Sequence, residues 1–162
     1  MDRVTGDALT HVDGDGRGRM VDVGSKPVTA RTAVASARVL MSAATRALAL
    51  SGGGPKGPVL EVARFAGIAA AKRTAELIPF CHTLPHDVVD VRIVPEGEGA
   101  LAIEATASAT WRTGVEMEAL TAAAVAALTL VDMLKAVEKT LVVSDLRLER
   151  KSGGRSGEWR RP

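Results

Sequence analysis

One long apolar segment carries charged residues at both of its ends. Residues 113–139 are predicted to form a single helix, with Glu116 and Glu118 in its first turn and Asp132 and Lys135 late in it. Residues three apart share a helix face, so Asp132 and Lys135 can meet. A partly buried acid and amine have shifted pKa values and can share protons, which is general acid–base chemistry. A surface ion pair of little energetic consequence is the alternative.

The two ends of this helix lie too far apart to serve one site within a chain. Carboxylates in a first turn are favoured by the helix dipole, so Glu116 and Glu118 need no further role. Glu118 and Asp132 are fourteen residues apart, which is about 21 Å along a helix. Two such helices packed antiparallel across a two-fold axis place the start of one beside the end of the other. The spacing therefore predicts an active site shared between subunits.

A proline-flanked segment, residues 79–88, contains Cys81, His82 and His86. Three such side chains are the minimum for a zinc site. No second cysteine or acidic cluster lies nearby, and Pro85 disfavours a regular helix across both histidines. We therefore predict no metal here and interpret His82 as a polar contact or proton donor. A structural histidine is the alternative.

Two glycine-rich loops have the composition of anion-binding loops. Residues 51–58 contain Lys56, and residues 151–157 contain Lys151 and Arg155. Glycines let backbone N–H groups approach a phosphate, and the cations pair with its charge. Surface turns of the same composition are common, but the two loops together indicate a polyanionic ligand.

The elements that must position these residues alternate between strands and helices. Periodicity predicts a strand in 26–41, helices in 42–50 and 59–78, two strands in 87–112 and a strand in 141–150 after the long helix. The order strand, helices, two strands, helix, strand predicts an α+β fold, with a ferredoxin-like antiparallel sheet and helices packed on one face.

The length of 162 residues fits a single domain. Residues 1–18 are rich in Gly and Asp without periodicity, which predicts a flexible N-terminal leader before a single α+β catalytic domain, residues 19–162. Aromatic residues make up only 2% of the chain, so the core must be built from small aliphatic side chains. Such a core buries less area per residue, which favours an oligomer.

Composition also limits the compartment and the partners. The net charge of +2 does not indicate a nucleic-acid partner. The single cysteine, Cys81, excludes an internal disulfide and suits a reducing compartment. The longest nearly apolar run, residues 119–131, is shorter than the ~20 residues that cross a membrane. We expect a cytoplasmic protein that binds neither membrane nor nucleic acid.

Four sequence strings resemble those of the cyclic pyranopterin monophosphate synthase family, also called molybdenum cofactor biosynthesis protein C. They are MVDVGSK at 20–26, AGIAAAKRTAELIPFCH at 66–82, the long helix at 113–139, and KSGGRSG at 151–157. The resemblance runs from about residue 9 to the end of the chain, in the same order.

The resemblance implies a homohexamer, a trimer of dimers, with active sites at the dimer interface. It also implies a nucleotide-derived substrate. Members convert 3′,8-cyclo-7,8-dihydro-GTP into cyclic pyranopterin monophosphate and release pyrophosphate, with no cofactor and no central metal.

The resemblance also implies roles for individual residues. Asp132 and Lys135 match the family's catalytic acid/base pair, and Lys56 and Lys151 match its other catalytic or phosphate-binding lysines. The substrate-binding positions are matched by Phe80, Cys81, His82, Met117 and Glu118, with Glu116 adjacent.

Two positions depart from the pattern expected of this family. Thr83 stands where proline is usual, and Arg155 stands where lysine is common. Arginine keeps the charge but changes the donor geometry of the loop. Arg19 and Arg31 are further candidates for contact with the triphosphate.

Two other classes of protein share parts of this pattern. An oligomeric nucleotide-binding module would use the same basic loops without chemistry, but a binder of polyanions has no need of the acid Asp132. A metal-dependent hydrolase would use Cys81, His82 and His86, for which the ligand set is incomplete. The enzyme hypothesis explains more of the charged residues.

Overall fold

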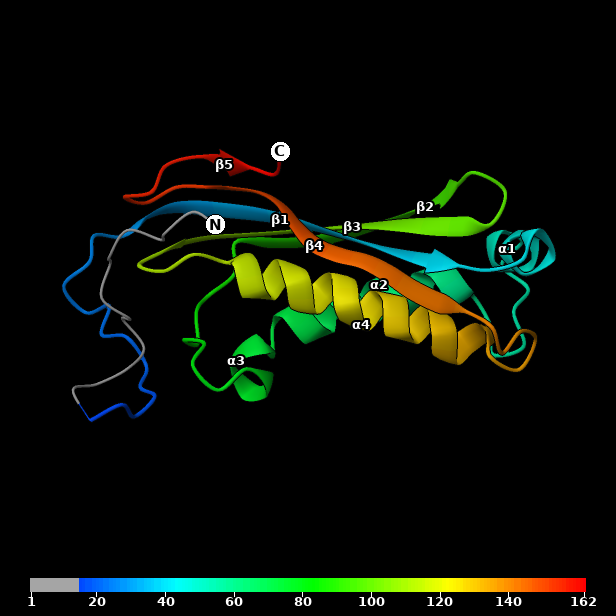
Figure 1. Cartoon of the computed structure of the whole chain (residues 1–162), viewed down its shortest axis with the longest axis horizontal. Coiled ribbons are helices and arrows are strands. Elements are labelled where there is room, and N and C mark those ends of the chain that lie inside the picture. The colour runs from blue at the N-terminus through cyan, green and yellow to red at the C-terminus, as the bar shows by residue number, and fades with distance from the viewer. Residues whose placement is uncertain (1–14) are drawn as a thin grey trace.

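The computed structural model describes residues 15–162, so the first fourteen residues of the predicted leader lie outside the described part of the chain. The elements, in chain order, are β1 (Thr29–Leu40), α1 (Ala43–Leu50), α2 (Val59–Ala71), α3 (Thr74–Leu77), β2 (Val88–Glu96), β3 (Ala100–Trp111), α4 (Glu116–Leu134), β4 (Val142–Ser152) and β5 (Trp159–Arg160) (Figure 1).

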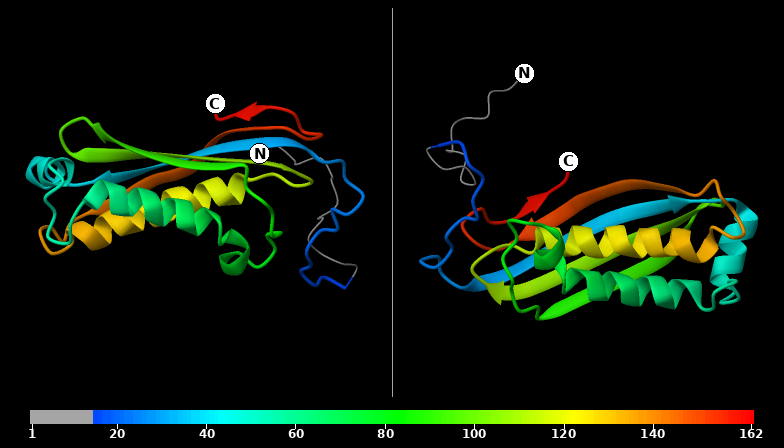
Figure 2. Two further views of the ribbon diagram at one scale, coloured as in Figure 1. Left: turned by 180° about the vertical axis from the view of Figure 1, so that it is seen from behind. Right: turned by 90° about the horizontal axis from the view of Figure 1, so that it is seen from below.

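The strands form one antiparallel sheet in the order β2-β3-β1-β4-β5. Helices α2 and α4 lie side by side along one face of this sheet (Figure 2). With the short elements α1, α3 and β5 left aside, the element order is the β-α-β-β-α-β pattern of ferredoxin-like folds. The predicted α+β fold with helices on one face is confirmed.

Small aliphatic side chains build the core, as the composition predicts. The helix-facing positions of β1 and β3 alternate along each strand and are fully buried, with Ala33, Ala35, Ala37 and Val39 on β1 and Leu101, Ile103, Ala105 and Ala107 on β3. Gly67 lies where α2 contacts α4, and a Cβ there would come 2.8 Å from the Ala122 carbonyl oxygen. The two helices can therefore pack closely against each other and the sheet.

The helix predicted over residues 59–78 is two helices. The Thr74 hydroxyl donates a hydrogen bond of 2.9 Å to the Ala71 carbonyl, which ends α2 at that residue. Helix α3 then begins in a new direction (Figure 1). Thr74 is buried, so this break is part of the core.

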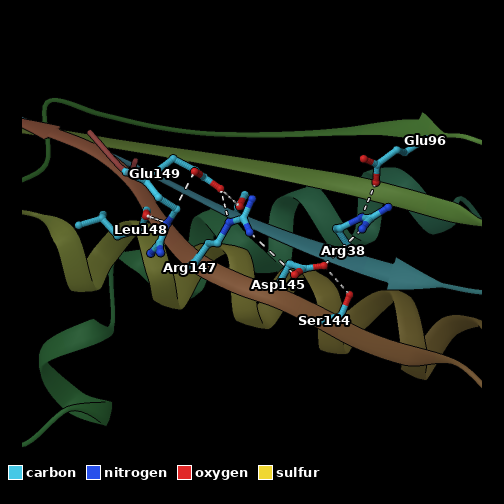
Figure 3. A network of polar contacts seen from close by, with 9 residues as sticks. Arg38, Glu96, Ser144, Asp145, Arg147, Leu148 and Glu149 are labelled. Carbon is cyan, nitrogen blue, oxygen red and sulfur yellow. Dashed lines mark hydrogen bonds and ion pairs between the residues drawn. The ribbon is translucent and has the colours of Figure 1, made fainter. Parts of the chain in front are cut away.

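The sheet face away from the helices carries a polar network (Figure 3). Ser36 and Arg38 alternate with the buried residues of β1 and therefore point to this face. The Arg38 Nε atom lies 2.6 Å from the Glu96 carboxylate, and Ser36 Oγ donates to Glu149 at 2.5 Å. The network contains none of the predicted site residues, which lie at the helices and at one edge of the sheet.

Helix α4 is long and apolar enough, by length and composition, to cross a membrane. A stretch of 18 of its 19 residues has a mean hydropathy of 1.7. However, 56% of that stretch is buried within the fold, where it packs against the sheet and α2. Its apolar character is that of a core helix.

Candidate active site

A cavity of about 400 Å³ lies at the start of α4 and gathers the predicted substrate-binding residues. We call it the acidic pocket. Its lining is Val21, Val23, Lys26, Phe80, Cys81, His82, Leu84, Thr113, Gly114, Glu116, Met117 and Glu118. All six residues predicted to bind substrate are in this set, and they come from two segments that are far apart in the sequence.

The segment before β1 closes one side of the acidic pocket. His82 Nε2 lies 2.8 Å from the Val21 carbonyl oxygen. A carbonyl oxygen only accepts, so Nε2 carries the hydrogen and Nδ1 of a neutral ring is left as an acceptor. Val21, Val23 and Lys26 were not predicted as lining residues. The string at 20–26 was the signal available, because it is one of the four that carried the resemblance.

Glu118 lines the acidic pocket and is only 3% exposed. Burial raises the pKa of Glu118 to about 7, a hydrogen bond from its own backbone partly offsets this rise, and the nearby Glu116 carboxylate adds to it. Burial, followed by the charge of Glu118, also raises the pKa of the Cys81 thiol. The pocket therefore holds a carboxyl group that can gain or lose a proton near neutral pH, beside a thiol that stays protonated.

A second cavity, of about 820 Å³, adjoins the acidic pocket. We call it the basic pocket. Five cationic side chains line it: Lys26, Arg31, Arg112, Lys151 and Arg155. The two cavities share the lining residues Lys26, Thr113, Gly114 and Glu116, so they are direct neighbours. At their boundary the Lys151 ammonium lies 2.8 Å from the Glu116 carboxylate.

The basic pocket contains donors that the fold leaves unused. The Nε atoms of Arg31 and Arg112 are buried and have no hydrogen-bond partner among residues 15–162. A buried donor without a partner costs free energy that an anionic ligand would recover. Gly153 has a φ of 101°, and a Cβ there would lie 2.1 Å from the Ala30 carbonyl oxygen. The backbone of the loop lies so close to Ala30 and Arg31 on β1 that only glycine fits at this position.

The structure places the candidate arginines differently from one another. Arg31 and Arg155 line the basic pocket, whereas Arg19 lines neither cavity. Arg112 was not predicted, although it directly precedes the string that begins at Thr113. The feature that could have predicted Arg112 is its place as a basic residue between a predicted strand and the long helix.

The other predicted catalytic residues meet at the far end of α4. The Asp132 carboxylate lies 2.6 Å from the Lys135 ammonium and 2.7 Å from the Lys56 ammonium. The loop at 51–58 therefore serves this end of the helix, and Lys56 and Lys151 lie at opposite ends. The two loops have similar compositions, so the sequence alone did not predict that they lie at opposite ends of α4.

The predicted partial burial of the acid and amine is wrong for the single chain. The side chains of Asp132 and Lys135 are 52% and 59% exposed. They are exposed because they lie on the stripe of α4 that faces away from the sheet. The hydrogen bond from Lys135, and then that from Lys56, lowers the pKa of Asp132 to about 2. Asp132 is therefore a carboxylate at neutral pH that holds two ammonium groups.

Within residues 15–162, no group of three or more His, Cys, Asp or Glu side chains is placed to hold a metal ion. Cys81 and His82 line the acidic pocket, whereas His86 lines neither cavity.

Comparison with known proteins gives one consistent result. The profile of the MoaC family matches residues 20–154. The chain belongs to the MoaC family. It is 60% identical over 156 residues to the cyclic pyranopterin monophosphate synthase of Chloroflexus aggregans, covering 96% of this chain and 94% of that protein. Identity to the synthase of a Nocardioides species is 58% over 156 residues, with coverage of 95% and 96%.

A further MoaC relative comes from Mycobacterium tuberculosis. Its cyclic pyranopterin monophosphate synthase 3 is 54% identical over 153 residues, which cover 94% of this chain and 86% of that protein. The family resemblance predicted from the four sequence strings is confirmed. The MoaC match also includes both ends of α4, the whole lining of the acidic pocket, and that of the basic pocket except Arg155 and Ser156.

Proposed function

We propose that this chain is a cyclic pyranopterin monophosphate synthase that converts 3′,8-cyclo-7,8-dihydro-GTP into cyclic pyranopterin monophosphate and pyrophosphate. The observation that carries this proposal is that the acidic and basic pockets adjoin and share four lining residues. A substrate with a heterocycle at one end and a triphosphate at the other needs two such adjoining environments.

The acidic pocket suits the heterocycle. Rebuilding the guanine imidazole portion into a pyrazine ring needs repeated proton transfers. Glu118, whose pKa is about 7, can both accept and donate a proton at neutral pH. The carboxylate form can also accept N–H donors from the guanine edge. His82, held by the Val21 carbonyl, offers a second polar group in a fixed orientation.

The basic pocket suits the triphosphate. Loss of pyrophosphate builds negative charge on the leaving group, and preorganised cations stabilise that charge. The cations here are Lys151 on β4, Arg31 on β1 and Arg112 directly after β3. The unpartnered Nε atoms of the two arginines give them directional donors for phosphate oxygens.

The group around Asp132 acts, in this proposal, in the pocket of a second subunit. Met117, Leu128 and Asp132 share the outward stripe of α4, and Leu128 is 60% exposed. Phe65 on the adjacent α2 is 59% exposed. Exposed apolar side chains on neighbouring helices favour a subunit contact. Two α4 helices packed antiparallel on this stripe bring the Asp132 end of one to the Met117 end of the other.

Lys135 and Lys56 are the proton donors or phosphate partners in this composite site, and Asp132 positions them. An ionised Asp132 with a pKa near 2 cannot itself supply a proton at neutral pH. Its hydrogen bonds to both ammonium groups fix their positions. We also propose a homohexamer, a trimer of dimers, because the family resemblance implies it, and a cytoplasmic location for a single catalytic domain of residues 19–162, because the composition favours it.

The direct test is a turnover assay. Purified protein is given the cyclised dihydro-GTP, and the pyranopterin product and pyrophosphate are measured. Formation of both in equal amounts is expected. Tight binding of the substrate without product would instead favour the nucleotide-binding module, the second candidate that the same two pockets allow.

A further inference from the structure

We propose that residues 159–161 form a clasp that fixes the loop 152–156 of the basic pocket, and that Arg161 is a positioning residue for polyphosphate. The inference rests on the proposed role of the basic pocket. It adds the side chain of Arg161 to the functional machinery, although residues 159–161 line neither pocket.

Strand pairing holds the loop on both its entry side and its exit side. On its entry side, β4 pairs with β1, with Lys151 opposite Ala33 and Ser152 opposite Thr32. On its exit side, β5 pairs with β4, with Trp159 opposite Lys151. Lys151 thus has β1 on one side and the clasp on the other. Without the clasp, β4 is the edge of the sheet at this lysine, and the loop has one free end.

Arg161 fastens the clasp through both its backbone and its side chain. Its backbone N–H donates to the Glu149 carbonyl at 2.8 Å, and its Nε donates to the Leu148 carbonyl at 2.8 Å. The guanidinium also lies 5.9 Å from the Trp159 ring centre and 3.9 Å from the Glu149 carboxylate. Leu148 and Glu149 lie on β4, a few residues before Lys151 (Figure 3).

The loop itself is poorly suited to stay ordered. Gly153, Gly154 and Gly157 have φ values of 101°, 70° and 65°. Glycines lose more conformational freedom on ordering than other residues, so the ordered loop needs compensating contacts. One backbone hydrogen bond, from Gly157 N–H to the Gly154 carbonyl at 3.2 Å, closes the turn. The clasp supplies the remaining restraint.

The clasp contributes little to the core. Both residues of β5 are exposed, with Trp159 at 38%. Weakening it should therefore leave the fold and the subunit contacts in place, which makes its role separable from stability.

The experiment measures binding of inorganic tripolyphosphate to the full chain by titration calorimetry. Arg161→Ala removes the side-chain contacts, and Arg161→Pro also removes the backbone donor. We expect binding to weaken roughly three- to tenfold for Arg161→Ala and more for Arg161→Pro, in line with lost hydrogen bonds. KM for the substrate should rise by a similar factor with kcat nearly unchanged. Arg161→Lys should also weaken tripolyphosphate binding, because lysine lacks the Nε donor that bonds to the Leu148 carbonyl.

Arg160→Ala is the matched control. Arg160 directly precedes Arg161, its side chain is 69% exposed against 39% for Arg161, and its one ion pair within residues 15–162 is with Glu158 at 3.0 Å. It should bind tripolyphosphate as the wild type does. Amide hydrogen exchange over residues 152–158 should become faster in Arg161→Pro and stay unchanged in Arg160→Ala, which reports loop order independently of activity.

Lys151→Ala separates the two proposals. If Lys151→Ala weakens tripolyphosphate binding and Arg161→Pro does not, the proposed role of the clasp is wrong, and the basic pocket is still supported as the polyphosphate site. If Lys151→Ala binds as tightly as wild type, the basic pocket is not the polyphosphate site and the clasp proposal falls with it. Weakening by both, with Arg160→Ala unchanged, supports both.

Discussion

At the scale of single residues, burial gives Glu118 a proton affinity that an exposed glutamate lacks. The sequence predicted that Glu118 lies near the substrate, from its place in a motif. Its shifted pKa was not predictable, because it depends on contacts with segments far away in the chain. Asp132 shows the opposite case. The spacing predicted its pairing with Lys135, but Lys56 reaches it from a loop 76 residues earlier.

Glu118→Gln should remove a pH dependence of stability. The raised pKa means that Glu118 favours folding below about pH 4.5, and that this contribution is lost as the pH rises through about 7. A shift of this size corresponds to about 3 kcal/mol. Between pH 5 and pH 8, the free energy of unfolding of wild type should therefore fall relative to that of the glutamine variant, as measured by urea titration. An unchanged difference between the two proteins would show that Glu118 is not buried as described.

Asp132→Asn should abolish most turnover while leaving the fold intact. The amide keeps the shape but loses the charge that holds Lys135 and Lys56, so we expect kcat to fall roughly 10²-fold or more. The pair is exposed, so the thermal midpoint should barely change. Glu61→Gln is the control, because Glu61 forms an exposed pair of the same spacing with Arg64 on α2. Equal loss of activity in both variants would contradict a special role for Asp132.

At the scale of elements, periodicity predicted the strands and the long helix but not two local features. A single buried hydroxyl, that of Thr74, ends α2, and nothing in the hydrophobic pattern of residues 59–78 marks that event. Strand β5 is two residues long and follows a glycine-rich turn, so it has no periodicity to detect. Both features depend on tertiary contacts. The core strands and α4 were predictable because each repeats its pattern over many residues.

Gly67→Ala should destabilise the packing of α2 on α4. Alanine normally stabilises a helix by roughly 0.5–1 kcal/mol relative to glycine. Here the added Cβ would lie 2.8 Å from the Ala122 carbonyl and 3.2 Å from the Ala126 Cβ. Overpacking costs typically 1–3 kcal/mol, so a net loss of about 1 kcal/mol is expected. Denaturant unfolding measures it. A gain in stability would mean that the helices can separate without cost.

At the scale of the whole molecule, the fold separates the chemistry into two groups at opposite ends of α4. The spacing predicted this separation, and the structure confirms that the acidic pocket and the Asp132 group lie at different ends of the helix. The outward stripe between them is apolar and open in the single chain. A second subunit on this stripe would cover it and unite the two groups.

Leu128→Glu should therefore weaken the assembly. A buried, unpaired charge at the proposed two-fold contact costs several kcal/mol. Light scattering after gel filtration should show smaller species than wild type, with activity lost in parallel. Leu50→Glu is the control, because this leucine is also exposed but lies on α1 and not on α4. Unchanged assembly of Leu128→Glu would place the contact elsewhere.

The shared site has a direct test in mixed subunits. Glu118→Ala and Asp132→Asn chains, each inactive alone, are co-expressed with different tags, and the assemblies that carry both are purified and assayed. Random pairing gives each mixed dimer one intact composite site and one doubly defective site, so recovery of about one quarter of wild-type activity is predicted in the unfractionated mixture and about one half in mixed dimers. Activity no higher than that of the separate variants would contradict an active site built from two subunits.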